Sequence, residues 1–185
     1  MNNIEIKKAK IKNGIFLAYE YLEKTDNYEN KISTSSDAPI HDDLRESFKA
    51  LVPHFALLTE ETTKKTFDSC IKSGKIHDSL GKFEVTGFTI GGNGDTEGVV
   101  ISGHKVLESG NKVNFSTPFQ MFDDSENYDY ATELLEAVEQ LKNEVYEYME
   151  GKQAPKMVVG TLDFGEEDEE AFQMVDDLED FGSDE

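Results

Sequence analysis

Asn13-Gly14 separates two runs of alternating residues at the start of the chain, Ile4–Lys12 and Ile15–Leu22. An Asn-Gly pair fills both positive-φ positions of a type I′ turn, so these residues predict a β-hairpin. The apolar residues of the first run change phase halfway, which predicts a β-bulge near Lys7-Lys8. The chain therefore begins with antiparallel strands, and the rest of the fold has to continue that sheet.

Segments of strand and helix then follow in groups. A weaker, polar strand is expected around Tyr28–Thr34 as an edge strand, and Ser36–Pro39 should break the chain before a helix. That helix begins near Asp42, and Pro53 should kink or restart it. The region between the helix and the next strand, residues 59–81, shows only one or two amphipathic turns.

Alternation returns at Lys82, and a second hairpin is expected from Gly98–Leu107 and Lys112–Phe119. The most regular helical pattern of the chain follows in residues 126–150. One apolar stripe runs along it, with glutamates outside the stripe. Gly151 should end this helix, since glycine is the usual residue just after a helix C-terminus.

Strands grouped in runs favour an α+β fold over a parallel α/β sheet. We expect an antiparallel sheet of about five strands, in two hairpin or meander units, with two main helices on one face. An oligonucleotide-binding barrel with extra helices is the alternative. Residues 1–157 should form this single domain, and residues 158–185 have too few apolar side chains to offset ordering entropy. The second segment is therefore expected to be a disordered acidic tail.

Charge is distributed unevenly along the chain. The formal net charge is −21, yet residues 1–12 and residues 62–82 each carry a net charge of +3. Residues 161–185 contain twelve carboxylates and no Lys or Arg. The mean field repels phosphate backbones and anionic membranes, so any nucleic-acid role needs a local basic surface.

Several function classes lack support in the sequence. No motif of a hydrolase, zinc protease or phosphate-binding loop is present, so we expect no catalytic activity and no cofactor. His41 and His54 would lie about 19 Å apart on an unbroken helix, which disfavours a metal site. Cys70 is the only cysteine, and neither an apolar span nor a signal-like start is seen. A cytoplasmic protein without membrane contact is expected.

Lysines and strand aromatics together suggest a single-stranded DNA-binding surface. Cations would meet the phosphates while aromatic rings stack on bases, as in sequence-tolerant single-strand binders. Tyr19, Tyr21 and Phe115 are the candidate stacking residues. The candidate phosphate contacts from the two basic islands are Lys7, Lys8, Lys10, Lys12, Lys64, Lys65, Lys72, Lys75 and Lys82.

The acidic tail contains aromatic residues among its carboxylates, above all in Asp176–Phe181. This stretch resembles the C-terminal tails of bacterial and phage single-stranded DNA-binding proteins. The resemblance implies competition with DNA for the basic groove and recruitment of replication or repair proteins. It departs from those tails by continuing through Gly182–Glu185 beyond the aromatic residue. The implied partner-binding residues are Phe172, Asp176, Asp177, Leu178, Asp180 and Phe181.

The body of the chain is similar to a family of small proteins of tailed phages and prophages over about residues 1–156. The segments that carry this resemblance are Ile40–Leu44, Val52–Leu58, Phe83–Gly92 and Gly151–Pro155. The resemblance implies a phage origin, hence the host-cell cytoplasm, and a setting of DNA replication or recombination. It assigns no chemistry.

Two functional hypotheses follow. The first is a phage single-stranded DNA-binding accessory protein of replication or recombination, whose tail competes with DNA and recruits partners. The second is an acidic DNA mimic or host-takeover inhibitor, in which the glutamates of residues 126–150 copy phosphates. The sequence leaves the oligomeric state open, including a homo-oligomer.

Overall fold

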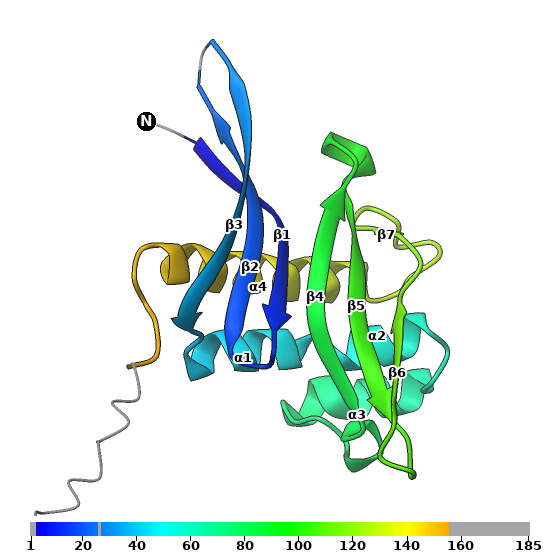
Figure 1. Ribbon diagram of the computed structural model, residues 1–185. Coiled ribbons are helices and arrows are strands. Elements are labelled where there is room, and N and C mark those ends of the chain that lie inside the picture. Colours follow the sequence, from blue (N-terminus) through cyan, green and yellow to red (C-terminus); the bar gives the residue numbers. More distant parts are fainter. Residues whose placement is uncertain (1–2, 26, 156–185) are drawn as a thin grey trace, which may run out of the picture.

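Seven strands and four α-helices make up the part of the chain that the structure, a computed structural model, describes: residues 3–25 and 27–155 (Figure 1). The strands are β1 (Asn3–Lys12), β2 (Phe16–Lys24), β3 (Glu29–Pro39), β4 (Phe83–Gly91), β5 (Gly98–Val106), β6 (Lys112–Ser116) and β7 (Gln120–Met121). The helices are α1 (Asp42–Ala50), α2 (Val52–Leu58), α3 (Lys64–Ser73) and α4 (Ala131–Met149). Two short 3₁₀ turns, η1 (Asp78–Leu80) and η2 (Gly94–Thr96), complete the elements.

All strand pairs are antiparallel. The strands follow the order β3-β2-β1-β4-β5-β6, and β7 pairs with the first two residues of β5. The α+β prediction is confirmed. The sheet is open, so the barrel alternative is wrong: β3 and β6 end the order without pairing with each other. The strand count exceeds the expected five partly because the predicted last strand, Lys112–Phe119, divides near Pro118, which cannot donate a ladder hydrogen bond.

The first hairpin forms as the sequence predicts. Asn13 and Gly14 have φ angles of 53° and 70°, and the Ile15 amide donates to the Lys12 carbonyl at 3.1 Å. The β1–β2 register shifts between Ile6 and Lys8, where the bulge was expected.

The third strand is longer than predicted. β3 continues through the Ser36–Pro39 segment, which the sequence was expected to use as a break before the helix. Proline is tolerated there because β3 is an edge strand, so its missing N–H removes no ladder bond. The Pro39 carbonyl accepts a hydrogen bond from the Ala154 amide at 3.0 Å, which fixes the end of the described chain beside β3.

The helices lie on one face of the sheet (Figure 1). α1 and α2 meet at Leu51, and Pro53 lies in the first turn of α2, as the proline predicted. α3 lies in the segment that showed little pattern. The Thr63 hydroxyl caps its start, and Gly74, with a φ of 63°, follows its last residue.

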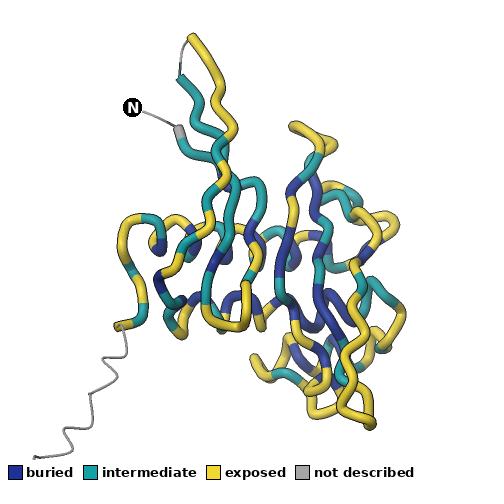
Figure 2. Tube along the Cα trace, viewed as in Figure 1, coloured by how far each residue is buried: buried dark blue, intermediate teal, exposed yellow. Residues whose placement is uncertain are grey.

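The core lies between the helices and the sheet. The apolar stripe of α4 is buried from Leu134 to Tyr148, as its spacing predicts, and Tyr148 meets Tyr19 of β2 edge to face. The Tyr148 hydroxyl donates to the Ala38 carbonyl at 2.6 Å. Phe48 of α1 packs near Phe88 of β4. Figure 2 shows that the strands are buried along the stretches that lie over the helices. No described helix combines the length and apolarity needed to span a membrane.

Candidate nucleic-acid interface

The central strand β1 separates apolar and basic side chains onto opposite faces. Ile6 and Ala9 are buried toward the helices. Lys8, Lys10 and Lys12 alternate with them and project from the side of the sheet on which no described helix lies, which we call the open face (Figure 1). At about 3.3 Å rise per residue, neighbouring lysines of this row are about 6.6 Å apart. β1 thus presents a line of cations to solvent.

Small side chains surround the middle of this lysine row. Residues directly opposite one another in antiparallel strands share a face, so the pairing register identifies the neighbours of Lys10. From one edge of the sheet to the other, its row on the open face is Ser35, Ala18, Lys10, Gly87, Ser102 and Ser116. A Cβ at Gly87 would lie 2.9 Å from the Ala9 carbonyl oxygen and 3.4 Å from the Lys10 stem. The other side chains of this row are small, so the Lys10 side chain projects beyond them.

Two aromatic side chains stand on the same face at either end of the lysine row. Phe16 pairs with Lys12 and is half-buried. The ring of Phe119 is 46% exposed and lies over Gly91, two residues along β4 from Thr89, which pairs with Lys8. Alternation with the inward-facing residues of β2 could have identified Phe16 from the sequence, whereas the position of Phe119 depends on a loop.

The aromatic residues predicted to stack on bases lie on the helix-covered face instead. Tyr19 packs against Tyr21 and against Tyr148, with ring centroids 6.3 Å apart in both pairs. Phe115 stacks on Phe55 of α2 at 4.7 Å. This placement argues against a stacking role, because the side chains that share a face with buried Leu17 point into the core.

The two basic islands do not form one surface. Lys64, Lys65 and Lys72 belong to α3, in the helix layer, while the lysines of β1 project from the open face. Lys64 forms an ion pair with Asp129. Lys82, which follows α3 and η1, lies 3.5 Å from Glu108. Lys75 lies in the same stretch after α3 and makes no ion pair with the described residues. Among the described residues, the α3 lysines therefore do not share a groove with the lysines of β1.

Carboxylates neutralise part of the β1 row. Lys7, at the bulge, pairs with Glu5, and Lys8 lies 3.7 Å from Glu20. A hydrogen bond from Lys31, followed in importance by the charge of Lys8, holds the pKa of Glu20 below its usual value even though partial burial opposes it. These acids leave a smaller basic surface than the lysine count suggests.

The far end of the row is less neutralised. Lys12 donates to the Ser35 hydroxyl at 2.9 Å, and within residues 3–25 and 27–155 neither Lys10 nor Lys12 has an ion-pair partner. Both side chains are exposed. Lys10 and Lys12, with Phe16 beside them, are therefore the part of the open face best suited to an anion.

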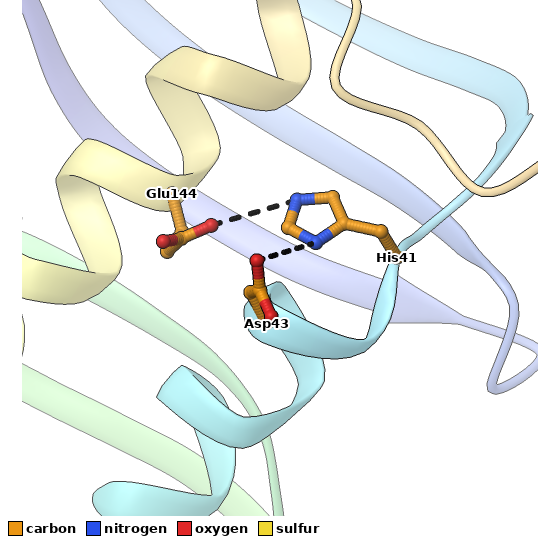
Figure 3. A group of neighbouring side chains, drawn as sticks. All are labelled: His41, Asp43 and Glu144. Carbon is orange, nitrogen blue, oxygen red and sulfur yellow. Dashed lines mark ion pairs between the residues drawn. The ribbon is translucent and has the colours of Figure 1, made fainter.

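A second group of polar side chains joins the start of α1 to α4 (Figure 3). His41 caps α1: its Nδ1 accepts a hydrogen bond from the Leu44 amide at 3.3 Å. Because Nδ1 uses its lone pair in this way, neutral His41 carries its proton on Nε2. That nitrogen is buried and lies 3.5 Å from Glu144 Oε2. Asp43 Oδ2 lies 4.0 Å from Nδ1.

The ammonium group of Lys152 already forms ion pairs with Asp43 and Glu144. Lys152 Nζ lies 2.9 Å from both Asp43 and Glu144, and 2.7 Å from Glu147. These hydrogen bonds, with Glu147 first, raise the pKa of Lys152, and Lys152 lowers the pKa of Asp43. A metal would have to displace the ammonium, and His41 Nε2 would have to lose its proton before that nitrogen could bind the metal. The group therefore fits a structural link better than a metal site, and it fixes residues 152–154 beside α1.

His54 is a core residue. Its Nδ1 lies 2.8 Å from the Tyr128 hydroxyl, and its ring meets Phe67 edge to face at 4.8 Å. Burial lowers the pKa of His54 to about 3, so the side chain is neutral at physiological pH. Its contacts are structural, and it does not approach His41.

The predicted partner-binding residues Phe172, Asp176, Asp177, Leu178, Asp180 and Phe181 lie outside the described residues. Comparisons with models of protein families, with curated proteins and with solved structures find no match to this chain. Function is therefore inferred from the chain's own geometry.

Proposed function

We propose that the protein is a phage single-stranded DNA-binding accessory protein of replication or recombination, whose DNA site is the open face along β1. The observation that carries this proposal is the row Lys8, Lys10 and Lys12 on the uncovered side of the sheet, with Phe16 and Phe119 at its two ends. A strand of DNA would place phosphates along the lysines and stack bases on the two rings. The role is one of binding without catalysis.

The overall charge of −21 limits how strong this binding is. The mean field of the protein repels DNA, and the open face supplies the local attraction on which this proposal depends. Binding should therefore be modest and depend strongly on salt. The acidic segment 158–185 would compete with DNA for the same lysines and bind replication or repair proteins, as its sequence suggests.

Fluorescence anisotropy with labelled oligo-dT at low ionic strength tests the DNA site. Replacing Lys8, Lys10 and Lys12 by Gln removes three charges from the open face. If each contacts one phosphate, the slope of log K against log salt should fall in magnitude by about 2. The matched control, Lys65→Gln/Lys72→Gln/Lys75→Gln, removes three charges near α3 and should change the slope little. Equal effects of the two triple variants would contradict the proposal.

Removing the acidic segment tests the proposed competition. A chain of residues 1–160 lacks twelve carboxylates of the full protein and should bind oligo-dT more tightly. Its binding should also show a steeper salt dependence, because more phosphate contacts become available. If the shortened chain ignores oligo-dT at low salt, the DNA-binding proposal fails.

The DNA-mimic hypothesis has less support from the geometry. The outer face of α4 exposes Glu136, Glu139 and Glu147, which could imitate phosphates. Lys142, however, donates to Glu139 at 2.7 Å, and Lys152 neutralises Glu147. Recovery of a host nucleic-acid enzyme by the lysine-to-glutamine variants that no longer bind oligo-dT would favour this second hypothesis.

A further inference from the structure

A cleft of about 490 Å³ opens where β1 and β4 separate. The two strands pair only from Lys8 to Lys10 on β1, and β1 turns back after Lys12 while β4 extends to Phe83. Helix α1 and residues 76–82 close the other sides of this cleft. Incomplete pairing in the sheet thus leaves an entrance to the core beside α1.

The floor of the cleft is apolar and its rim is mainly basic. The floor is formed by Phe48, Val52, Leu80, Phe83 and Val85. Arg45 and Lys49 of α1 and Lys82 before β4 stand at the rim, together with two carboxylates, Asp78 and Glu84. An apolar floor below cations suits an aromatic or aliphatic side chain that is flanked by carboxylates.

Two of the three rim cations, Lys49 and Lys82, have only weak partners of their own, whereas Arg45 donates to the Gly14 carbonyl at 2.6 Å. Lys49 lies 3.1 Å from Glu46, and Lys82 lies 3.5 Å from Glu108. The Glu46 and Glu108 side chains are 68% and 94% exposed, and exposed pairs of this kind contribute little to stability. A denser group of carboxylates could replace them at small cost.

The chain itself contains such a group. We propose that the cleft binds the protein's own segment Asp176–Phe181, with the Phe181 ring on the apolar floor and the neighbouring carboxylates at the rim cations. This segment has four carboxylates in six residues, and Leu178 is its second apolar side chain. The charges are complementary, since the rim supplies three cations against its own two carboxylates, Asp78 and Glu84.

The chain is long enough to reach. The hydrogen bond from Ala154 to Pro39 places the end of the described chain just before α1, and α1 is about 14 Å long at 1.5 Å per residue. Phe181 lies 26 positions after Pro155, and an extended chain of that length spans roughly 86 Å. The cost of closing such a loop grows only slowly with its length.

This inference rests on one part of the proposed function, the competition of the acidic segment with DNA. It says where that segment binds when DNA is absent. Ile11, which lines the cleft, lies between Lys10 and Lys12 in the sequence of β1. A segment anchored at Phe181 would bring its carboxylates close to the lysines proposed to contact DNA.

The chain contains no tryptophan, so a Phe181→Trp substitution in the full-length protein creates a single fluorescent probe. In the absence of DNA, we expect its emission to be blue-shifted, with an acrylamide quenching constant several-fold below that of free tryptophan amide. The Lys49→Gln/Lys82→Gln pair should abolish both effects, as should high salt. The matched pair Lys65→Gln/Lys72→Gln on α3 should leave them unchanged.

The result that would overturn the proposal is solvent-like emission from the Phe181→Trp protein, or shielding that the rim and α3 pairs affect equally. A Phe172→Trp probe should remain solvent-like, and shielding of the indole in that variant alone would also overturn the assignment.

Hydrogen exchange tests the docking without the larger indole ring. Backbone amides of residues 76–85 should exchange faster in Phe181→Ala than in the unmodified protein, and unchanged exchange would count against docking. No DNA is present, so the outcome is independent of the oligo-dT experiments.

Discussion

The two faces of β1 differ in what covers them. Ile6 and Ala9 are buried against the helix layer, whereas Lys10 and Lys12, in the same strand, face solvent. Packing restricts the first set to side chains of particular size, because interiors are close-packed. The second set has no such restriction. The covered face therefore holds the fold together, while the open face is free to carry a binding function.

Neighbouring residues of β4 provide the largest expected contrast between the faces. Phe88 is 1% exposed on the covered face, and Phe88→Ala should lower the free energy of unfolding by about 3–5 kcal/mol. Thr89 faces the open side, and Thr89→Ala should change it by no more than about 0.5 kcal/mol. Urea unfolding measures both, and similar losses would mean that the open face is also covered.

Acid should weaken the covered side through His54. Its pKa is about 3 in the folded protein and 6.5 when unfolded, so the unfolded chain takes up a proton first as the pH falls. The contribution of His54 to stability is therefore complete well above pH 6.5 and is lost as the pH falls through that value, by about 1.4 kcal/mol at pH 5.5. Urea unfolding between pH 8 and pH 5.5 measures this loss. His54→Gln should flatten the dependence, and an unchanged slope would show that His54 is not responsible.

Two tyrosines of α4 give a smaller contrast. Tyr148→Phe removes the buried hydrogen bond to the Ala38 carbonyl and should cost about 1 kcal/mol. Tyr146 is 43% exposed, so Tyr146→Phe serves as the control and should have little effect. Thermal unfolding compares the two variants. A loss in Tyr146→Phe as large as that in Tyr148→Phe would contradict the assignment of the buried bond.

The smallest expected effect on stability comes from Lys10. Lys10→Ala should change the free energy of unfolding by less than about 0.5 kcal/mol, because the side chain is exposed and lacks an ion-pair partner among the described residues. The same variant should weaken oligo-dT binding and reduce the salt slope by about 0.7. Loss of stability without loss of binding would reverse the functional roles of the two faces.

Local patterns were sufficient to predict much of the fold. Asn13-Gly14 specifies its turn because few other residues adopt two successive positive φ angles. The stripe of α4 and the kink at Pro53 also follow from local geometry. The end of β3 was predicted wrongly, because an edge strand tolerates a proline that would end a central strand.

The candidate site was predicted only in part. The β1 lysines were identified, and alternation places three of them on one face. Tyr19, Tyr21 and Phe115 were predicted to stack on bases, yet each shares a face with core residues. The lysines of α3 were grouped with those of β1, although the two sets belong to different layers. The distance between two residues in the sequence does not show whether they lie in the same layer of the fold.

The amino-acid sequence by itself determined which residues share a face, since strand and helix periodicity are local properties of the backbone. Which face the helices cover was decided only by the tertiary structure. The packing of Tyr148 on Tyr19 and of Phe55 on Phe115 joins segments distant in the chain. Burial of apolar area depends on such distant partners, so the identity of the open face, and with it the candidate site, arises from packing.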